Sequence, residues 1–122
     1  MMWLDVISIA IGAFFGANAR YALSTWIKRH VKWDFPIATL VINLSGAFVL
    51  GVVVQLQLAT DWNLFATTGF LGAFTTFSTF KLESVQLSAE RKWKKVILYQ
   101  VVTYSGGLGL IAAGMFLGSL LS

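Results

Sequence analysis

The sequence predicts an all-α membrane protein in which residues 1–122 form one domain of four transmembrane helices. Hydrophobic residues make up 57% of the chain and charged residues only 11%, whereas soluble domains carry about 25% charged residues. Four apolar stretches are each long enough to cross a bilayer core of about 30 Å. They cover residues 4–26, 36–58, 63–87 and 96–121.

Tryptophan supports these boundaries. An indole ring is half buried at the membrane–water interface while its N–H stays hydrated, so tryptophan gathers at the ends of transmembrane helices. All five tryptophans lie at or just outside a predicted helix end: Trp3, Trp26, Trp33, Trp62 and Trp93.

The charges predict an orientation. Seven basic residues occupy the links after the first and third stretches, whereas the opposite side has Asp5 and Asp61 and no lysine or arginine. The positive-inside rule therefore predicts a multi-pass protein of the cell inner (plasma) membrane, with both links in the cytoplasm and both termini outside. The seven residues are Lys28, Arg29, Lys32, Arg91, Lys92, Lys94 and Lys95.

The composition argues against several classes of protein. There is no cysteine and only one histidine, and no pair of acids is expected to meet, so the chain is predicted not to be an enzyme. The net charge of +4 comes from basic links between apolar stretches, which indicates membrane topology rather than nucleic-acid binding.

The first stretch contains small residues and one charged residue within the predicted membrane span. Gly12 and Gly16 have the spacing that lets two helix backbones approach closely. Arg20 lies about 7 Å past the helix centre at the helical rise. Its guanidinium either reaches back to the cytoplasmic interface or draws anions into a vestibule, and the sequence leaves both open.

Polar residues form short stripes on two other predicted helices. Thr39 and Asn43 are four residues apart, as are Tyr99 and Thr103, so each pair shares a helical face. The Asn43 amide needs partners in hydrocarbon. An interhelical hydrogen bond is the favoured interpretation, and a donor facing an anion path is the alternative.

The third stretch is predicted to be interrupted. Gly69 and Gly72 precede a run of Thr, Ser and Phe at 75–80, and these are mediocre helix formers. Unwound backbone at membrane depth lines a cavity or is buried in protein, and its carbonyls can coordinate a cation. Phe77 and Phe80 share a face and offer electropositive ring edges to an anion. A kinked packing helix explains the composition equally well.

Three motifs together resemble one family. They are GANARY at 16–21, ATLVINLSGAFVLG at 38–51 and GFLGAFTTFSTF at 69–80, with Glu83 following the last. They closely resemble the small bacterial fluoride channels, the Fluc or CrcB family. The resemblance covers nearly the whole chain.

The resemblance implies a fluoride-selective channel subunit that exports cytoplasmic fluoride passively and gives fluoride resistance. Such channels are antiparallel dimers with two fluoride pores. By motif, Asn43 donates to fluoride and Phe77 and Phe80 are the paired rings of the pores. The remaining implied roles are hydroxyl contacts from Thr39, Thr79, Tyr99 and Thr103, a vestibule arginine at Arg20, and backbone carbonyls of Gly72 and Thr75 on a structural Na⁺ at the dimer interface.

The uneven distribution of basic residues between the two sides of the membrane affects which partner subunit is expected. Single-gene members of that family resemble dual-topology proteins, which insert both ways, whereas paired genes encode subunits of opposed, fixed orientation. The strong bias here leaves two assemblies open: a dimer of this chain with itself, and a dimer with an oppositely oriented homologue.

Two other classes of protein remain as alternatives. Proton-coupled small multidrug transporters are also four-helix antiparallel dimers, but they resemble one another in a glutamate within the first helix. The corresponding positions here are Ala13, Phe14 and Phe15, so the titrating group is missing. The third class is an accessory subunit that transports nothing alone.

Overall fold

A computed structural model describes residues 2–32 and 35–121, the side chains at positions 2, 60, 77 and 78 excepted. Within these ranges the regular structure is entirely helical. Its three long helices are α1 (Met2–His30), α2 (Ile37–Leu56) and α6 (Trp93–Leu121). Each of them is long and apolar enough to cross a membrane.

The helix α1 extends past the apolar stretch that predicted it, ending at His30 instead of position 26. Basic side chains satisfy carbonyl oxygens of its last turns: His30 Nδ1 lies 2.8 Å from the Trp26 oxygen, and Lys32 Nζ donates to the Lys28 oxygen at 3.2 Å. Positive charge also complements the dipole at this end. The apolar pattern alone could not include these charged turns.

The helix α2 is slightly shorter than predicted at both ends. Pro36 precedes the helix instead of occupying its first turn, and Gln57 ends it with a φ of 53°. This left-handed conformation cannot continue a right-handed helix.

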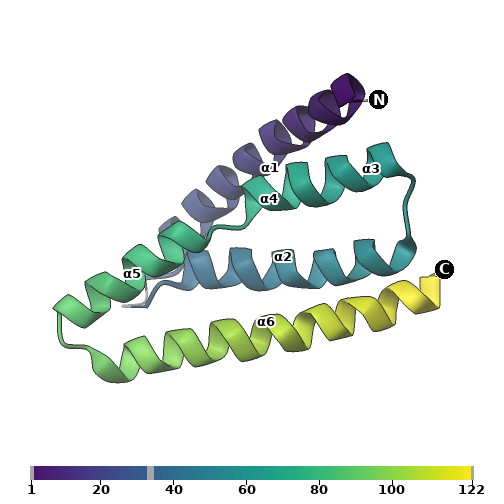
Figure 1. Cartoon of the computed structure of the whole chain (residues 1–122). Helices are drawn as coiled ribbons and strands as arrows, with labels where there is room; N and C mark the ends of the chain where they lie inside the picture. The colour runs from purple at the N-terminus through teal and green to yellow at the C-terminus, as the bar shows by residue number, and fades with distance from the viewer. Residues whose placement is uncertain (1, 33–34, 122) are drawn as a thin grey trace.

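A further helical path runs from residue 60 to residue 89 in several pieces (Figure 1). Its members are α3 (Thr60–Leu64), the π-helix η1 (Phe65–Leu71), α4 (Gly72–Phe74) and α5 (Phe77–Ala89). Gly69 and Gly72 are helical. Only Thr75 and Thr76, between α4 and α5, leave the helical conformation.

The elements pack in two close pairs. In Figure 1, α2 lies along α6, and α1 lies along the path from α3 to α4. Glycines make both contacts tight. A Cβ atom at Gly12 or Gly16 would overlap carbonyl oxygens of η1, and one at Gly51 or Gly114 would overlap backbone across the α2–α6 contact. The predicted packing role of Gly12 and Gly16 is therefore confirmed.

Large apolar side chains cover much of the outside of the chain. Phe14, Leu108 and Phe116 are 64%, 72% and 67% exposed. Two small buried clusters form the interior: Phe80, Leu87, Val96 and Tyr99 in one, and Ile42, Leu71 and Phe74 in the other. An apolar exterior of this extent suits hydrocarbon rather than water.

Four of the tryptophans lie exposed near the ends of helical elements. Trp3 and Trp26 are near the two ends of α1, Trp62 is in α3, and Trp93 begins α6. This arrangement agrees with the interfacial positions predicted for them. The fifth, Trp33, lies outside the described residues.

Candidate functional site

The interruption between α4 and α5 consists of two threonines in extended conformation. Thr75 has φ −81° and ψ 161°, and Thr76 has φ −149° and ψ 115°. The Thr76 hydroxyl caps α5, because its Oγ1 accepts from the Thr79 N–H at 3.2 Å and donates to Thr79 Oγ1 at 3.1 Å. The helix therefore restarts with one of its first N–H groups satisfied by a threonine side chain.

Asn43 of α2 completes the backbone of the interruption. Its Nδ2 donates to the Thr76 carbonyl at 3.0 Å, and its Oδ1 accepts from the Thr76 N–H at 2.9 Å. In a continuous helix that N–H would donate to the Gly72 carbonyl. The Asn43 amide thus replaces a peptide group, which confirms the predicted interhelical hydrogen bond. One N–H of Nδ2 is left over from this pair, since an amide has two donors.

Gly46 lets α2 approach the interruption. A Cβ atom there would overlap the methyl group of Thr75. Thr75 itself keeps contact with the preceding helix, since its Oγ1 donates to the Leu71 carbonyl at 2.9 Å. The absence of a side chain at Gly46 and the amide of Asn43, one turn earlier, together fit α2 to the extended residues.

A small cavity of about 170 Å³ lies beside the interruption. Phe80 and Thr103 line it, together with Asn43, Thr75, Thr76 and Tyr104. The Thr103 hydroxyl is buried and has no hydrogen-bond partner within the described part of the chain. Phe80 is 1% exposed, and Tyr104 meets its ring at 90° with 5.6 Å between centroids. The cavity thus combines amide, hydroxyl and aromatic-edge groups.

A second cavity, of about 310 Å³, also adjoins Thr76. Arg20 lines it together with Lys28, Thr39, Thr76 and Thr79. Thr76 lines both cavities, so the basic recess and the recess around Thr103 share one residue of the extended backbone. Arg20 is half-buried, and it lines the same cavity as Thr76 of the interruption.

Tyr99 and Thr103, which were predicted to form one polar stripe, lie in different surroundings. Tyr99 is fully buried, and its hydroxyl donates to Glu83 Oε1 at 3.1 Å. Its ring packs against Phe80 with centroids 4.9 Å apart. Thr103 instead faces the small cavity, where Tyr104 rather than Tyr99 is its aromatic neighbour.

Gly72 and Thr75, the residues assigned to sodium, line a third cavity of about 320 Å³ with Thr67 and Gly46. Because Thr76 N–H donates to Asn43, the Gly72 carbonyl is released from its usual helical partner. Carbonyl oxygens are hard ligands that suit cations such as sodium. Among the described residues no group of three His, Cys, Asp or Glu gathers for a metal.

Sequence reasoning missed two residues of this site and cannot be assessed at a third. Thr76, which lines both cavities, and Tyr104 were outside the predicted set. A threonine directly before a helical run is a recognised capping signal, and it would have found Thr76. The predicted ring of Phe77 lies outside the described residues.

Comparison with known proteins identifies the family. A sequence model described as CrcB-like protein, Camphor Resistance (CrcB), matches residues 7–115. The chain belongs to this family. The resemblance predicted from the three motifs is therefore confirmed.

Curated relatives of the family are similar over nearly the whole chain. "Fluoride-specific ion channel FluC 2" of Bacillus thuringiensis subsp. konkukian is 47% identical over 96% of this chain and 99% of its own length. "Fluoride-specific ion channel FluC 1" of Geobacillus kaustophilus is 47% identical over 90% of this chain and 94% of its own. The FluC 1 protein of Listeria innocua is 41% identical over 96% and 99%.

The family and the fold agree on the broad class of protein. The relatives are named as ion channels, so the prediction that the chain is not an enzyme is confirmed. Three helices of membrane-spanning length and an apolar exterior fit the same class. The chain is a membrane protein of an ion-channel family.

Proposed function

We propose that the chain is a subunit of a fluoride-selective channel through which cytoplasmic fluoride leaves the cell passively, giving fluoride resistance. The relatives are named fluoride-specific ion channels, and these names suggest fluoride as the transported ion. The observation that carries the proposal is the extended backbone at Thr76, which lines both the Arg20 cavity and the Thr103 cavity. Irregular backbone at membrane depth belongs beside a cavity.

The groups around Thr76 suit a small, strongly hydrated anion. Such an ion enters a narrow path only if donors replace its water. The second N–H of Asn43 and the unpaired Thr103 hydroxyl are two such donors at the small cavity. The electropositive edge of Phe80 adds a third attraction. Arg20 raises the anion concentration in the recess before this point.

Fluoride efflux from liposomes tests the proposal. The chain, assembled either with itself or with its oppositely oriented homologue in sodium-containing liposomes, should release fluoride, followed with a fluoride electrode, with little release of chloride. Phe80→Ile should lower fluoride release, because a branched aliphatic side chain has no electropositive edge. Chloride release equal to fluoride release, or no fluoride release from the assembled protein, would refute the proposal.

The finer architecture follows as part of the same proposal. The path from residue 60 to residue 89 is a membrane crossing interrupted within the bilayer at Thr75 and Thr76, and two subunits assemble antiparallel. The partner is a second copy or an oppositely oriented homologue. The occurrence of FluC 1 and FluC 2 names among the relatives supports paired genes.

Topology reporters distinguish the two assemblies. The seven basic residues of the two links predict insertion into the plasma membrane with both termini outside. Reporters fused to the C-terminus should then give one orientation, and the chain expressed alone should conduct poorly without its homologue. Equal insertion in both orientations, with full efflux from the chain alone, would favour the homodimer.

We also propose that the carbonyls of Gly72 and Thr75 hold a structural Na⁺ at the dimer interface. A cation there would offset the partial negative charge of carbonyls released from helical hydrogen bonds. Replacing Na⁺ with N-methylglucamine on both sides of the membrane should lower fluoride release and dimer stability. If efflux and dimer dissociation are the same in both salts, the sodium site is wrong.

A further inference from the structure

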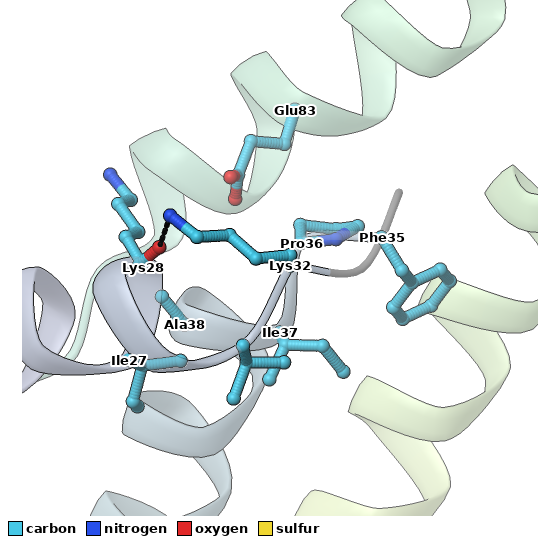
Figure 2. Close-up of a pocket in the computed structure, with 9 residues that line it drawn as sticks. Ile27, Lys28, Lys32, Phe35, Pro36, Ile37, Ala38 and Glu83 are labelled. Carbon is cyan, nitrogen blue, oxygen red and sulfur yellow. Dashed lines mark hydrogen bonds between the residues drawn. The ribbon is translucent and has the colours of Figure 1, made fainter.

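Two adjoining recesses lie where α1 ends, α2 begins and α5 passes above them (Figure 2). The larger recess has a volume of about 530 Å³, and Ile27, Val31 and Ile37 give it an apolar wall. The smaller recess has a volume of about 160 Å³. Phe35, Pro36 and Glu83 line both, so the two recesses share one wall. Lys28 also lines the Arg20 cavity, and neither the fluoride path nor the sodium proposal uses the other residues of these recesses.

The larger recess is basic. Lys28 and Lys32 line it from the end of α1, four residues apart. Lys32 Nζ donates to the Lys28 carbonyl, as the dashed line in Figure 2 marks. Neither ammonium forms an ion pair within residues 2–32 and 35–121. Two ammonium groups that form no ion pair among these residues, beside a cavity in which Glu83 is the one described carboxylate, are a setting that binds an anion such as a phosphate.

The smaller recess is acidic. Glu83 forms the shared wall, and Glu90 lines the far side with Gln86. The Tyr99 hydroxyl donates a hydrogen bond to Glu83 Oε1 at 3.1 Å, and this bond orients the carboxylate. Glu90 Oε2 lies 3.6 Å from Lys92 Nζ and is half exposed. A primary ammonium between Glu83 and Glu90 would gain charge-assisted hydrogen bonds from both sides.

The recesses also lie at a level where lipid headgroups are found. Trp26 and Trp93 are exposed at this end of the bundle, and tryptophan is typical of the headgroup region. The basic links lie at the same end. The molecule present there at the highest local concentration is a phospholipid, whose headgroup is polar and whose glycerol region can meet an apolar wall.

We propose that the double recess binds the headgroup of a zwitterionic aminophospholipid, phosphatidylethanolamine. Its phosphate faces Lys28 and Lys32, and its primary ammonium, two carbons away, faces Glu83 and Glu90. Phosphatidylcholine fits less well, because a trimethylammonium group has no N–H to donate and binds best in cages of several aromatic rings. Among the described residues, Phe35 is the one aromatic ring that lines these recesses.

Lipid retention by the full-length protein tests the basic recess. The detergent-solubilised chain is mixed with defined phospholipids, and bound lipids are counted by native mass spectrometry in the absence of fluoride. The K28Q/K32Q double variant should retain phosphatidylethanolamine about tenfold less than the unaltered chain, since both phosphate partners are lost. Arg29→Gln is the matched control, because it removes an exposed charge of the same helix end that lines neither recess.

The acidic recess is tested by methylation of the headgroup. Retention should fall stepwise from phosphatidylethanolamine through its mono- and dimethyl forms to phosphatidylcholine. Glu90→Gln should abolish this order while leaving phosphatidylglycerol, which has no ammonium, bound as before. Equal retention of phosphatidylethanolamine and phosphatidylcholine by the unaltered chain overturns the proposal, as does a loss in Arg29→Gln as large as in K28Q/K32Q.

A soluble competitor tests the source of the headgroup. Glycerophosphoethanolamine carries the same phosphodiester and amine without acyl chains, so it should displace the lipid only at far higher concentration. Displacement at equal concentration would assign the recess to a soluble phosphodiester and overturn the lipid assignment. None of these measurements depends on ion conduction, so they stand or fall separately from the fluoride proposal.

Discussion

Two contacts in the molecule bring two backbone segments close together in opposite ways. One is the contact of α1 with η1, and the other is the contact of α2 with the interruption. In the first, every helix keeps its own hydrogen bonds, and glycine merely removes the atoms that would separate the backbones. In the second, two residues leave the helix, and Asn43 supplies the missing hydrogen bonds. The first contact is therefore sensitive to size, and the second to polarity.

The largest loss of stability is expected from adding one carbon to the glycine contact. In Gly16→Ala the new Cβ would overlap the Phe70 carbonyl oxygen, so the two helices must separate, at about 3 kcal/mol. The matched control is Gly107→Ala, where nothing lies within 4 Å of the added atom. Thermal unfolding in detergent should show a large decrease for the first variant only. Equal midpoints would mean that the contact is not size-limited.

A smaller loss is expected when polarity is removed from the interruption at constant volume. Asn43→Leu leaves the Thr76 N–H and carbonyl unpaired, a loss of about 2 kcal/mol. The Thr76 amide should exchange with solvent deuterium much faster, measured by NMR without fluoride. The adjacent Thr75 amide is the internal control, because it donates to the Leu71 carbonyl. If both amides accelerate alike, the effect is general unfolding rather than loss of the pairing.

The cap of α5 should contribute less than the Asn43 pair. Thr76→Val keeps the shape of the side chain but loses the acceptor for the Thr79 N–H, and such caps are worth about 1 kcal/mol. Thr67→Val serves for comparison, since the Thr67 hydroxyl donates within its own helical path, to the Asn63 carbonyl. Thermal unfolding of the two variants gives the measurement, and an equal decrease in both would argue against a special role of Thr76.

The smallest effect on stability, with a clear effect on transport, is expected at Thr103. Its buried hydroxyl has no partner among the described residues, so Thr103→Val should change the unfolding free energy by less than about 0.5 kcal/mol. Fluoride release from liposomes should nevertheless fall, because the valine cannot donate to an anion in the cavity. Unchanged release would remove Thr103 from the path.

The three long helices were predictable because an apolar stretch long enough to cross a bilayer satisfies its backbone hydrogen bonds by forming a helix. Their ends were less predictable, since the charged residues up to His30 extend α1 through hydrogen bonds that hydropathy does not report. The interruption was expected within the stretch of Gly, Thr, Ser and Phe from Gly69 to Phe80. Gly69 and Gly72 are both helical. Gly69 packs against the backbone of α1 at Ile9 and Gly12, and the extended residues are β-branched Thr75 and Thr76.

The candidate site was predictable in part. Periodicity placed Thr39 and Asn43 on one face, and both line cavities that meet at Thr76. Spacing on α6 suggested that Tyr99 and Thr103 act together. Tyr99 turns instead to Glu83, sixteen residues earlier in the sequence, a contact that depends on how α5 crosses α6. Such tertiary pairings cannot be read from the spacing within one helix.

The π-helical turn at Phe65–Leu71 fixes the length of the segment before the interruption. A π-turn holds one residue more than an α-turn, and one residue corresponds to about 100° of rotation around a helix axis. Deleting any single residue between 65 and 71 would allow an ordinary α-helix to form, yet it would turn Thr76 away from Asn43. Substitutions in this segment should therefore be better tolerated than single deletions, because the number of residues in the segment sets the direction in which Thr76 faces.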